Sequence, residues 1–127
     1  MVRKWLKSNL LINPMEHTVD AKNQSLGRLA SEIAVLLRGK NSASYTPNKL
    51  VGVIVVLKNL KGAKFTGSKF DQKKYYHHSG YHSGIKARKL SELWESKPQE
   101  VLRKMVWRML PINRSRDKII RNLRFDG

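Results

Sequence analysis

The clearest helical pattern in the chain spans residues 25–39, which read SLGRLASEIAVLLRG. Its apolar residues recur at the spacing of one helical face. Ser25 can accept a free backbone N–H at the helix start, and Gly39 stands where helices commonly end in a left-handed residue. The pattern predicts an amphipathic helix that ends at Arg38 and turns one side toward a core. That side consists of Leu26, Leu29, Ala30, Ile33, Ala34, Leu36 and Leu37.

Strand-like segments flank this helix on both sides. His17–Asp20 precedes it, and Leu50–Leu57, which reads LVGVIVVL, follows it. The second segment is rich in β-branched residues and apolar at successive positions, which is typical of a strand buried on both faces of a parallel sheet. A strand, a helix and a buried strand form a βαβ unit, whose crossover should be right-handed. The sequence therefore predicts an α/β fold.

A second helix is predicted after Ser96. Ser96 and Gln99 have the spacing of a capping box, and Pro98 suits the first turn. The helix should end before Pro111, because the residue before a proline avoids the helical conformation. Its apolar stripe consists of Val101, Leu102, Met105, Val106 and Met109.

The remaining segments carry weaker patterns. Lys58–Lys74 is expected to form turns and one short strand, and Tyr75–Gly84 is expected to be a loop. Ser91 is expected to cap a short helix that runs through Trp94, and Leu123–Phe125 alternates like a final strand. No internal repeat or second domain is evident.

The charge of the chain points to a polyanionic partner. It has 26 Lys and Arg against 9 Asp and Glu, a formal net charge of +17 and a pI near 10.6. Nucleic acid is the commonest partner of so basic a domain, and an anionic membrane surface is second. Between Ile33 and Ser91 the only acid is Asp71. Glu92–Glu100 is richest in acids, and we expect this stretch to face away from the partner.

Several classes of protein fit the sequence poorly. There is no cysteine, which excludes disulfides and cysteine-ligated zinc. No apolar run approaches the roughly 20 residues of a transmembrane helix. Residues 1–15 are basic and free of acids, which predicts an N-terminal arm lying on the partner; an organellar presequence is the alternative. Residues 16–127 are expected to form a single domain.

Catalytic and metal chemistry are also disfavoured. His77, His78 and His82 lie close together, but adjacent residues on an extended chain point apart, and no carboxylate follows before Glu92. Ser79 beside His78 lacks a nucleophile-elbow motif. We therefore predict no enzyme activity, no cofactor, no metal and no small-molecule substrate.

The same segment suits nucleic acid better. Lys73–His78 sets two lysines beside aromatic rings, so phosphates could be neutralised and unpaired bases stacked. We assign one of Tyr75 and Tyr76 to the core and the other to RNA. Trp94 and Trp107 are expected to pack within the protein or against a protein neighbour.

Several short motifs of the sequence together resemble one protein family. A series of short motifs between Asp20 and Arg114 resembles the L-thirteen family of large-subunit ribosomal proteins, in order and spacing. The motifs are Asp20-Ala21-Lys22, Leu26–Ala34, Leu37–Lys40, Tyr45-Thr46-Pro47, Gly52, Asn59, Thr66-Gly67-x-Lys69, Lys74–Tyr81, Gly84-Ile85-Lys86 and Met109-Leu110-Pro111-x-Asn113-Arg114.

The resemblance implies a three-layer α/β/α domain around a small, mostly parallel sheet of about four strands, with basic loops. It implies binding to 23S-type ribosomal RNA, a role early in subunit assembly, and contacts with neighbouring ribosomal proteins. It implies no catalytic residues, and a ribosome in the cytoplasm or, alternatively, in a mitochondrion or plastid. The RNA-binding residues that it suggests are Arg38, Lys40, Lys69, Lys73, Tyr76, His78, Ser79, Gly80, Lys86, Asn113 and Arg114.

Within its length, the chain departs from the family pattern at three places. Val53 replaces an acid, His82-Ser83 replaces Pro-Gly, and Arg108 replaces a glycine. Gly27 and Gly52 are expected to serve the backbone. The main alternative is a free-standing RNA-binding or translational regulatory protein. A membrane-surface protein is less favoured, because the apolar stripes are needed for the core.

Overall fold

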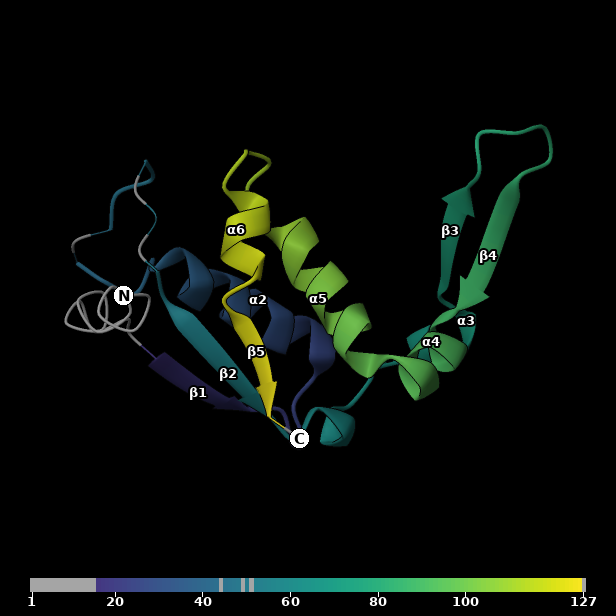
Figure 1. The fold of residues 1–127 in the computed structure, drawn as a ribbon. Coiled ribbons are helices and arrows are strands. Elements are labelled where there is room, and N and C mark those ends of the chain that lie inside the picture. The colour runs from purple at the N-terminus through teal and green to yellow at the C-terminus, as the bar shows by residue number, and fades with distance from the viewer. Residues whose placement is uncertain (1–15, 44, 49, 51, 127) are drawn as a thin grey trace, which may run out of the picture.

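The computed structural model describes residues 16–43, 45–48, 50 and 52–126. The predicted arm, residues 1–15, lies outside them. Figure 1 shows a small sheet with helices beside it and a separate hairpin at one end. The elements are β1 (Glu16–Asp20), α2 (Leu26–Arg38), β2 (Ile54–Lys58), the 3-10 turn η1 (Leu60–Gly62), α3 (Lys69–Gln72), β3 (Lys74–His78), β4 (Ile85–Lys89), α4 (Leu90–Ser96), α5 (Pro98–Met109), α6 (Arg116–Ile120) and β5 (Leu123–Asp126).

The main sheet has the order β1-β2-β5, and all its described pairings are parallel. Val19 lies opposite Leu57 in one pairing, and Leu57 lies opposite Phe125 in the other. The predicted βαβ unit and the final strand are therefore confirmed, as is the α/β class with a mostly parallel sheet. The described sheet has three strands, one fewer than the four or so expected.

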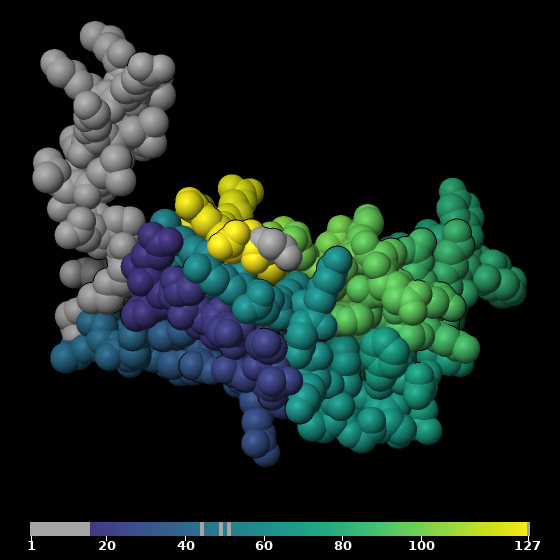
Figure 2. Space-filling view, turned by 90° about the horizontal axis from the view of Figure 1, so that it is seen from below, coloured from purple at the N-terminus to yellow at the C-terminus, as the bar shows by residue number. Residues whose placement is uncertain are grey.

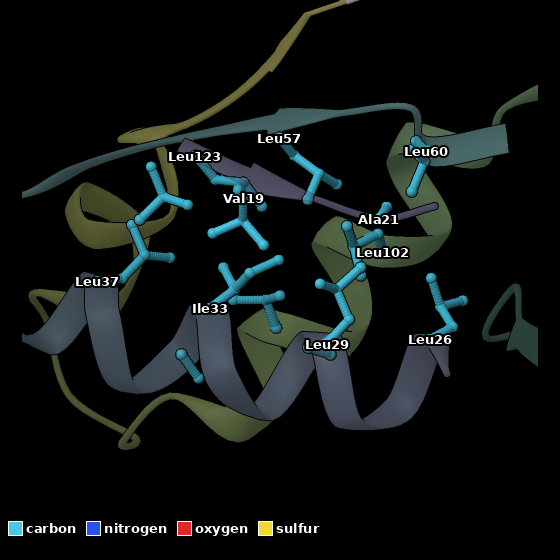
Figure 3. Close-up of a cluster of buried hydrophobic side chains, with 14 of the residues drawn as sticks. Val19, Ala21, Leu26, Leu29, Ile33, Leu37, Leu57, Leu60, Leu102 and Leu123 are labelled. Carbon is cyan, nitrogen blue, oxygen red and sulfur yellow. The ribbon is translucent and has the colours of Figure 1, made fainter. Parts of the chain in front are cut away.

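The core lies between this sheet and the helices. Val19, Leu57 and Leu123 point from the strands toward Leu29 and Ile33 of α2 (Figure 3). α2 also packs along α5, whose predicted stripe is buried at three positions. Those positions are Val101, Leu102 and Val106. The helices of the described chain cover one face of the sheet, so the second helical layer that the resemblance implied is not seen among the described residues.

The valine-rich strand is shorter and less buried than predicted. Pairing begins only at Ile54, since Gly52 has a φ of +67° and Leu50 is 55% exposed. Val55 and Leu57 are buried, whereas Ile54 and Val56 on the other face are half-buried. The prediction of full burial on both faces was therefore wrong.

Helix α2 matches its predicted bounds. Gly39 has a φ of +73° and donates its N–H to Leu36 O, while Lys40 donates to Val35 O. These two bonds form a Schellman motif, which pairs carbonyls at the helix end. Ser25 stands at the N-cap, but its side chain makes no cap hydrogen bond.

The start of α5 differs from the prediction. Lys97 precedes the helix, and the Ser96 hydroxyl donates back to Glu92 O and Leu93 O of α4, so the capping box is wrong. Pro98 does occupy the first turn. The helix ends at Met109, and the next residue, Leu110, has an extended ψ of 151°, as expected before a proline.

The largest error of the sequence analysis concerns residues 74–89. The predicted loop Tyr75–Gly84 largely belongs to an antiparallel hairpin of β3 and β4. Almost every side chain of these strands is exposed, so the sequence lacks the alternation that marks a half-buried strand. The short helix α3 was also missed, and Ser91 lies inside α4 rather than at its cap.

Both described tryptophans pack within the protein, as predicted. The Trp94 ring meets the Phe65 ring edge-on, with 4.9 Å between centroids. Trp107 Nε1 donates to Asp117 Oδ1 at 3.0 Å, and the Arg116 guanidinium carbon lies 3.4 Å from the ring centroid. Trp107 thereby ties α5 to α6.

Candidate nucleic-acid interface

The hairpin of β3 and β4 carries four Lys and Arg side chains and no carboxylate. Lys74 lies opposite Lys89, and His77 lies opposite Lys86. The two facing lysines destabilise the strand pair, because like charges in opposed positions repel. Figure 1 shows the hairpin standing away from the sheet, and all its strand residues are exposed except the half-buried Tyr75. A polyanion bound along it would relieve the repulsion.

The tip of the hairpin depends on unusual backbone conformations. Gly80 and Ser83 have φ values of +85° and +59°. The Gly80 N–H donates to His78 Nδ1 at 2.9 Å. A Cβ at Gly84 would lie 2.9 Å from Tyr81 O, closer than real Cβ contacts allow. Gly84 is therefore required for the tight approach of the chain to itself.

The two neighbouring tyrosines of β3 have different surroundings. Tyr76 is 68% exposed, whereas Tyr75 packs against the core, so the assignment of one tyrosine to the core is confirmed. Lys73 Nζ and Lys104 Nζ lie 5.3 and 4.9 Å from the Tyr75 ring centroid. Burial raises the pKa of the Tyr75 hydroxyl above its ordinary value, and the charge of Arg108 opposes this rise.

A groove of about 320 Å³ lies beside this tyrosine, and we call it the cationic groove. It runs between the start of α2, the segment around α3, and α5. Its lining includes no carboxylate and has an apolar floor that includes Leu26, Phe65, Leu90 and Met105. Five cationic residues also line it: Lys64, Lys69, Lys73, Lys104 and Arg108. In Figure 2 the teal and green segments that supply these cations gather at one end of the molecule.

A second groove, of about 490 Å³, lies at the other end of α2. Arg38 and Asn113 line it together with Lys118, and we call it the Arg38 groove. Arg38 Nη2 donates to Tyr45 Oη at 2.9 Å. Asn113 Oδ1 accepts a hydrogen bond from the Ser115 hydroxyl at 2.7 Å.

The structure distributes the eleven predicted RNA-binding residues over three places. The hairpin holds five, the cationic groove holds two, and four lie in or near the Arg38 groove. Ten of the eleven are exposed, and Arg38 is half-buried. The three sets are Tyr76, His78, Ser79, Gly80 and Lys86; Lys69 and Lys73; and Arg38, Lys40, Asn113 and Arg114.

Some cations at these places were not predicted. Lys104 and Arg108 line the cationic groove, and Lys118 lines the Arg38 groove. Lys104 and Arg108 are four residues apart on one helix, which places them on the same face. That spacing could have identified them as a pair.

Gly27 was assigned a backbone role wrongly, because its φ is not positive and a Cβ there would meet no atom within 4 Å.

The part of the chain that the structure describes lacks two features. Its residues include no group of three or more His, Asp or Glu side chains placed to hold a metal ion. Its helices include none long and apolar enough to cross a membrane.

These features define a class of protein, the small and strongly basic α/β domains, here with cations gathered on a projecting hairpin and in two grooves. Comparison with known families identifies one family within that class. The sequence model of the family described as Ribosomal protein L13 matches residues 14–125. The chain therefore belongs to the ribosomal protein L13 family, and the resemblance drawn from its motifs is confirmed.

Relatives from several organisms agree with this family. Large ribosomal subunit protein uL13 of Syntrophobacter fumaroxidans is 48% identical over 96% of this chain and 78% of that protein. The protein of the same name from Aquifex aeolicus is 47% identical over 84% of this chain and 74% of its own. Large ribosomal subunit protein uL13c of Gracilaria tenuistipitata var. liui is 46% identical over 75% of this chain and 66% of its own.

Proposed function

We propose that the chain is a structural protein of the large ribosomal subunit, which binds 23S-type ribosomal RNA and helps early subunit assembly. The observation that carries the RNA-binding part is the projecting hairpin, where Lys74 faces Lys89 and no carboxylate is present. The names of the relatives support the ribosomal part. The protein would act by positioning RNA, without catalysis and without a cofactor.

Affinity and specificity would come from different contacts. Lysines and arginines of the hairpin and the two grooves would bind phosphates, which supplies affinity and fixes orientation. Exposed Tyr76 and His78 would contact unpaired bases, since RNA is read mainly at single-stranded loops and bulges. All eleven predicted residues remain candidates for these contacts. Residues 16–127 would act as one domain, with residues 1–15 as a basic arm.

The site of action would be a ribosome, with neighbouring large-subunit proteins as further partners. Bacterial uL13 proteins and a uL13c protein of an alga are both among the relatives. We place the protein in the cytoplasm, with a mitochondrial or plastid ribosome as the alternative.

The direct test is binding of the full chain to purified large-subunit ribosomal RNA at increasing salt. With roughly six to ten phosphate contacts, the affinity should fall by about 10³ to 10⁵ between 50 and 200 mM salt. Weak binding that is almost independent of salt would contradict the proposal. Lys61→Gln, which alters an exposed cation outside both grooves, serves as the control for loss of one charge.

A further inference from the structure

The lining of the cationic groove combines cations with apolar side chains, and few kinds of ligand can contact both. Five cations line it, while its floor is apolar and includes Phe65 and Met105. A bare phosphate does not need an apolar floor, and an apolar protein segment does not need five cations. A nucleotide offers an apolar base face and an anionic phosphate together. The volume of about 320 Å³ is at the lower end of the range for small-molecule sites, roughly 300 Å³ upward.

Tyr75 supplies an independent observation in the same groove. Its hydroxyl oxygen is buried and has no hydrogen-bond partner among the described residues. A buried hydroxyl without a partner destabilises the free protein, so a ligand that pairs with it gains that free energy. Because the oxygen is covered, such pairing requires the Tyr75 side chain to shift when the ligand binds. The edge of a nucleobase carries both donors and acceptors that could then serve.

The start of α2 is also open toward an anion. The N–H groups of Gly27 and Arg28 have no partner within the helix, and the first turn contains no acidic residue. Gly27 lines the groove, and a Cβ built on it would meet no atom within 4 Å. The backbone is thus accessible at the point where the lysines approach.

We infer that the cationic groove binds one unpaired nucleotide of the ribosomal RNA. Its base would lie on the apolar floor beside Phe65 and Met105, with Tyr75 at its edge. Its phosphate would lie among the lysines and Arg108. This inference rests on the proposed function and adds to it a defined pocket for a single base.

The test uses a substitution that fills the groove without removing a charge. Gly27→Leu places a bulky side chain in the lining, and leucine is favoured over glycine in a helix. Gln24→Leu is the matched control, because Gln24 is exposed beside the same helix start but does not line the groove. Both full-length variants are titrated with purified large-subunit ribosomal RNA over a range of salt. Circular dichroism checks that each remains folded.

The expected result for Gly27→Leu is a loss of roughly tenfold in affinity that persists at high salt, because stacking of one base is lost, with a fall in the salt slope of about one or less from the displaced phosphate. Gln24→Leu should bind like the wild type. Arg108→Gln should lower both the affinity and the salt slope, the latter by about one. Tyr75→Phe should weaken binding without changing the slope.

Two results would overturn the inference. If Gly27→Leu binds as tightly as Gln24→Leu, the groove holds no part of the RNA. If the loss of affinity for Gly27→Leu disappears at high salt, the groove holds a phosphate and no base. In both cases steep, salt-dependent binding by the wild type would leave the proposed function intact, whereas its absence would remove the proposed function itself.

Discussion

Asp20 illustrates how a single exposed side chain orders a turn. Its carboxylate accepts hydrogen bonds from the Lys22 backbone N–H and from Asn59 Nδ2, each at 3.0 Å. These bonds, the Lys22 backbone bond foremost, hold the pKa of Asp20 below the ordinary value of 3.8. The ionised side chain thereby joins the end of β1 to Asn59, whose φ of +56° begins the turn after β2.

A pH dependence follows from Asp20. Because its folded-state pKa is lowered, its contribution to stability is present above about pH 3.8 and is lost as the pH falls through the folded pKa. Asp20→Asn should therefore be less stable than the wild type near neutrality, and the difference should shrink in acid. Urea unfolding between about pH 2 and 6 measures it. Glu32→Gln, on the exposed side of α2, is the control for loss of one carboxylate.

Gly84 offers a second prediction for a single residue. In Gly84→Ala the new Cβ would press on the Tyr81 carbonyl, at a local cost of about 1–3 kcal/mol. The hairpin buries little, so the melting temperature of the whole protein should change little while amide exchange in β3 and β4 becomes faster. Hydrogen exchange followed by NMR measures both. An unchanged exchange rate would show that the tip is not the constraint proposed here.

The elements differ in how far the sequence predicts them. α2, β1, α5 and β5 were predictable because each buries one side, and burial leaves an apolar period in the sequence. The hairpin was not, because its exposed strands require no such period. The eleven candidate residues came from family motifs, and their grouping depends on packing that no local pattern records. Arg108 and Lys69 share a groove although they are far apart in the chain.

The difference in burial between the core helices and the exposed hairpin predicts where substitutions destabilise the protein. Leu102 of α5 is fully buried against α2 and the sheet, so Leu102→Ala should lower the free energy of unfolding by about 2–5 kcal/mol. Tyr76→Ala removes a larger side chain that is 68% exposed and should change stability by about 0.5 kcal/mol or less. Urea unfolding compares the two variants. Equal losses would mean that the hairpin is part of the cooperative core.

The hairpin charges should show a conflict between stability and binding. Lys89→Gln removes one of two facing cations, so at low salt the free hairpin should gain about 0.2–1 kcal/mol. Under the proposed function the same change also removes a phosphate contact, so it should lower the salt slope of RNA binding by about one. Hydrogen exchange and RNA titration test the two effects, with Lys61→Gln as the control. Loss of binding without a gain in hairpin stability would contradict the repulsion argument.

In the whole molecule, the apolar core stabilises the fold, and the charged side chains are available for binding. The one-sided core of α2, α5 and three parallel strands holds the domain together. The net charge of +17 opposes compaction until a polyanion neutralises it. The lysines of the hairpin and the two grooves are exposed, where they can meet the polyanion that we propose. This division explains why the candidate interface can be basic at so many points without unfolding the protein.

The most direct measurement of the central claim is sedimentation of a native lysate through a sucrose gradient, with this protein quantified in every fraction. We predict that it follows the large ribosomal subunit at about one copy per subunit and remains bound at moderate salt. A variant that combines Lys74→Gln with Lys89→Gln should be displaced from that fraction at lower salt than the wild type. If the wild-type protein instead stays mainly at the top of the gradient, the ribosomal account is contradicted, and a free-standing RNA-binding or regulatory role takes its place.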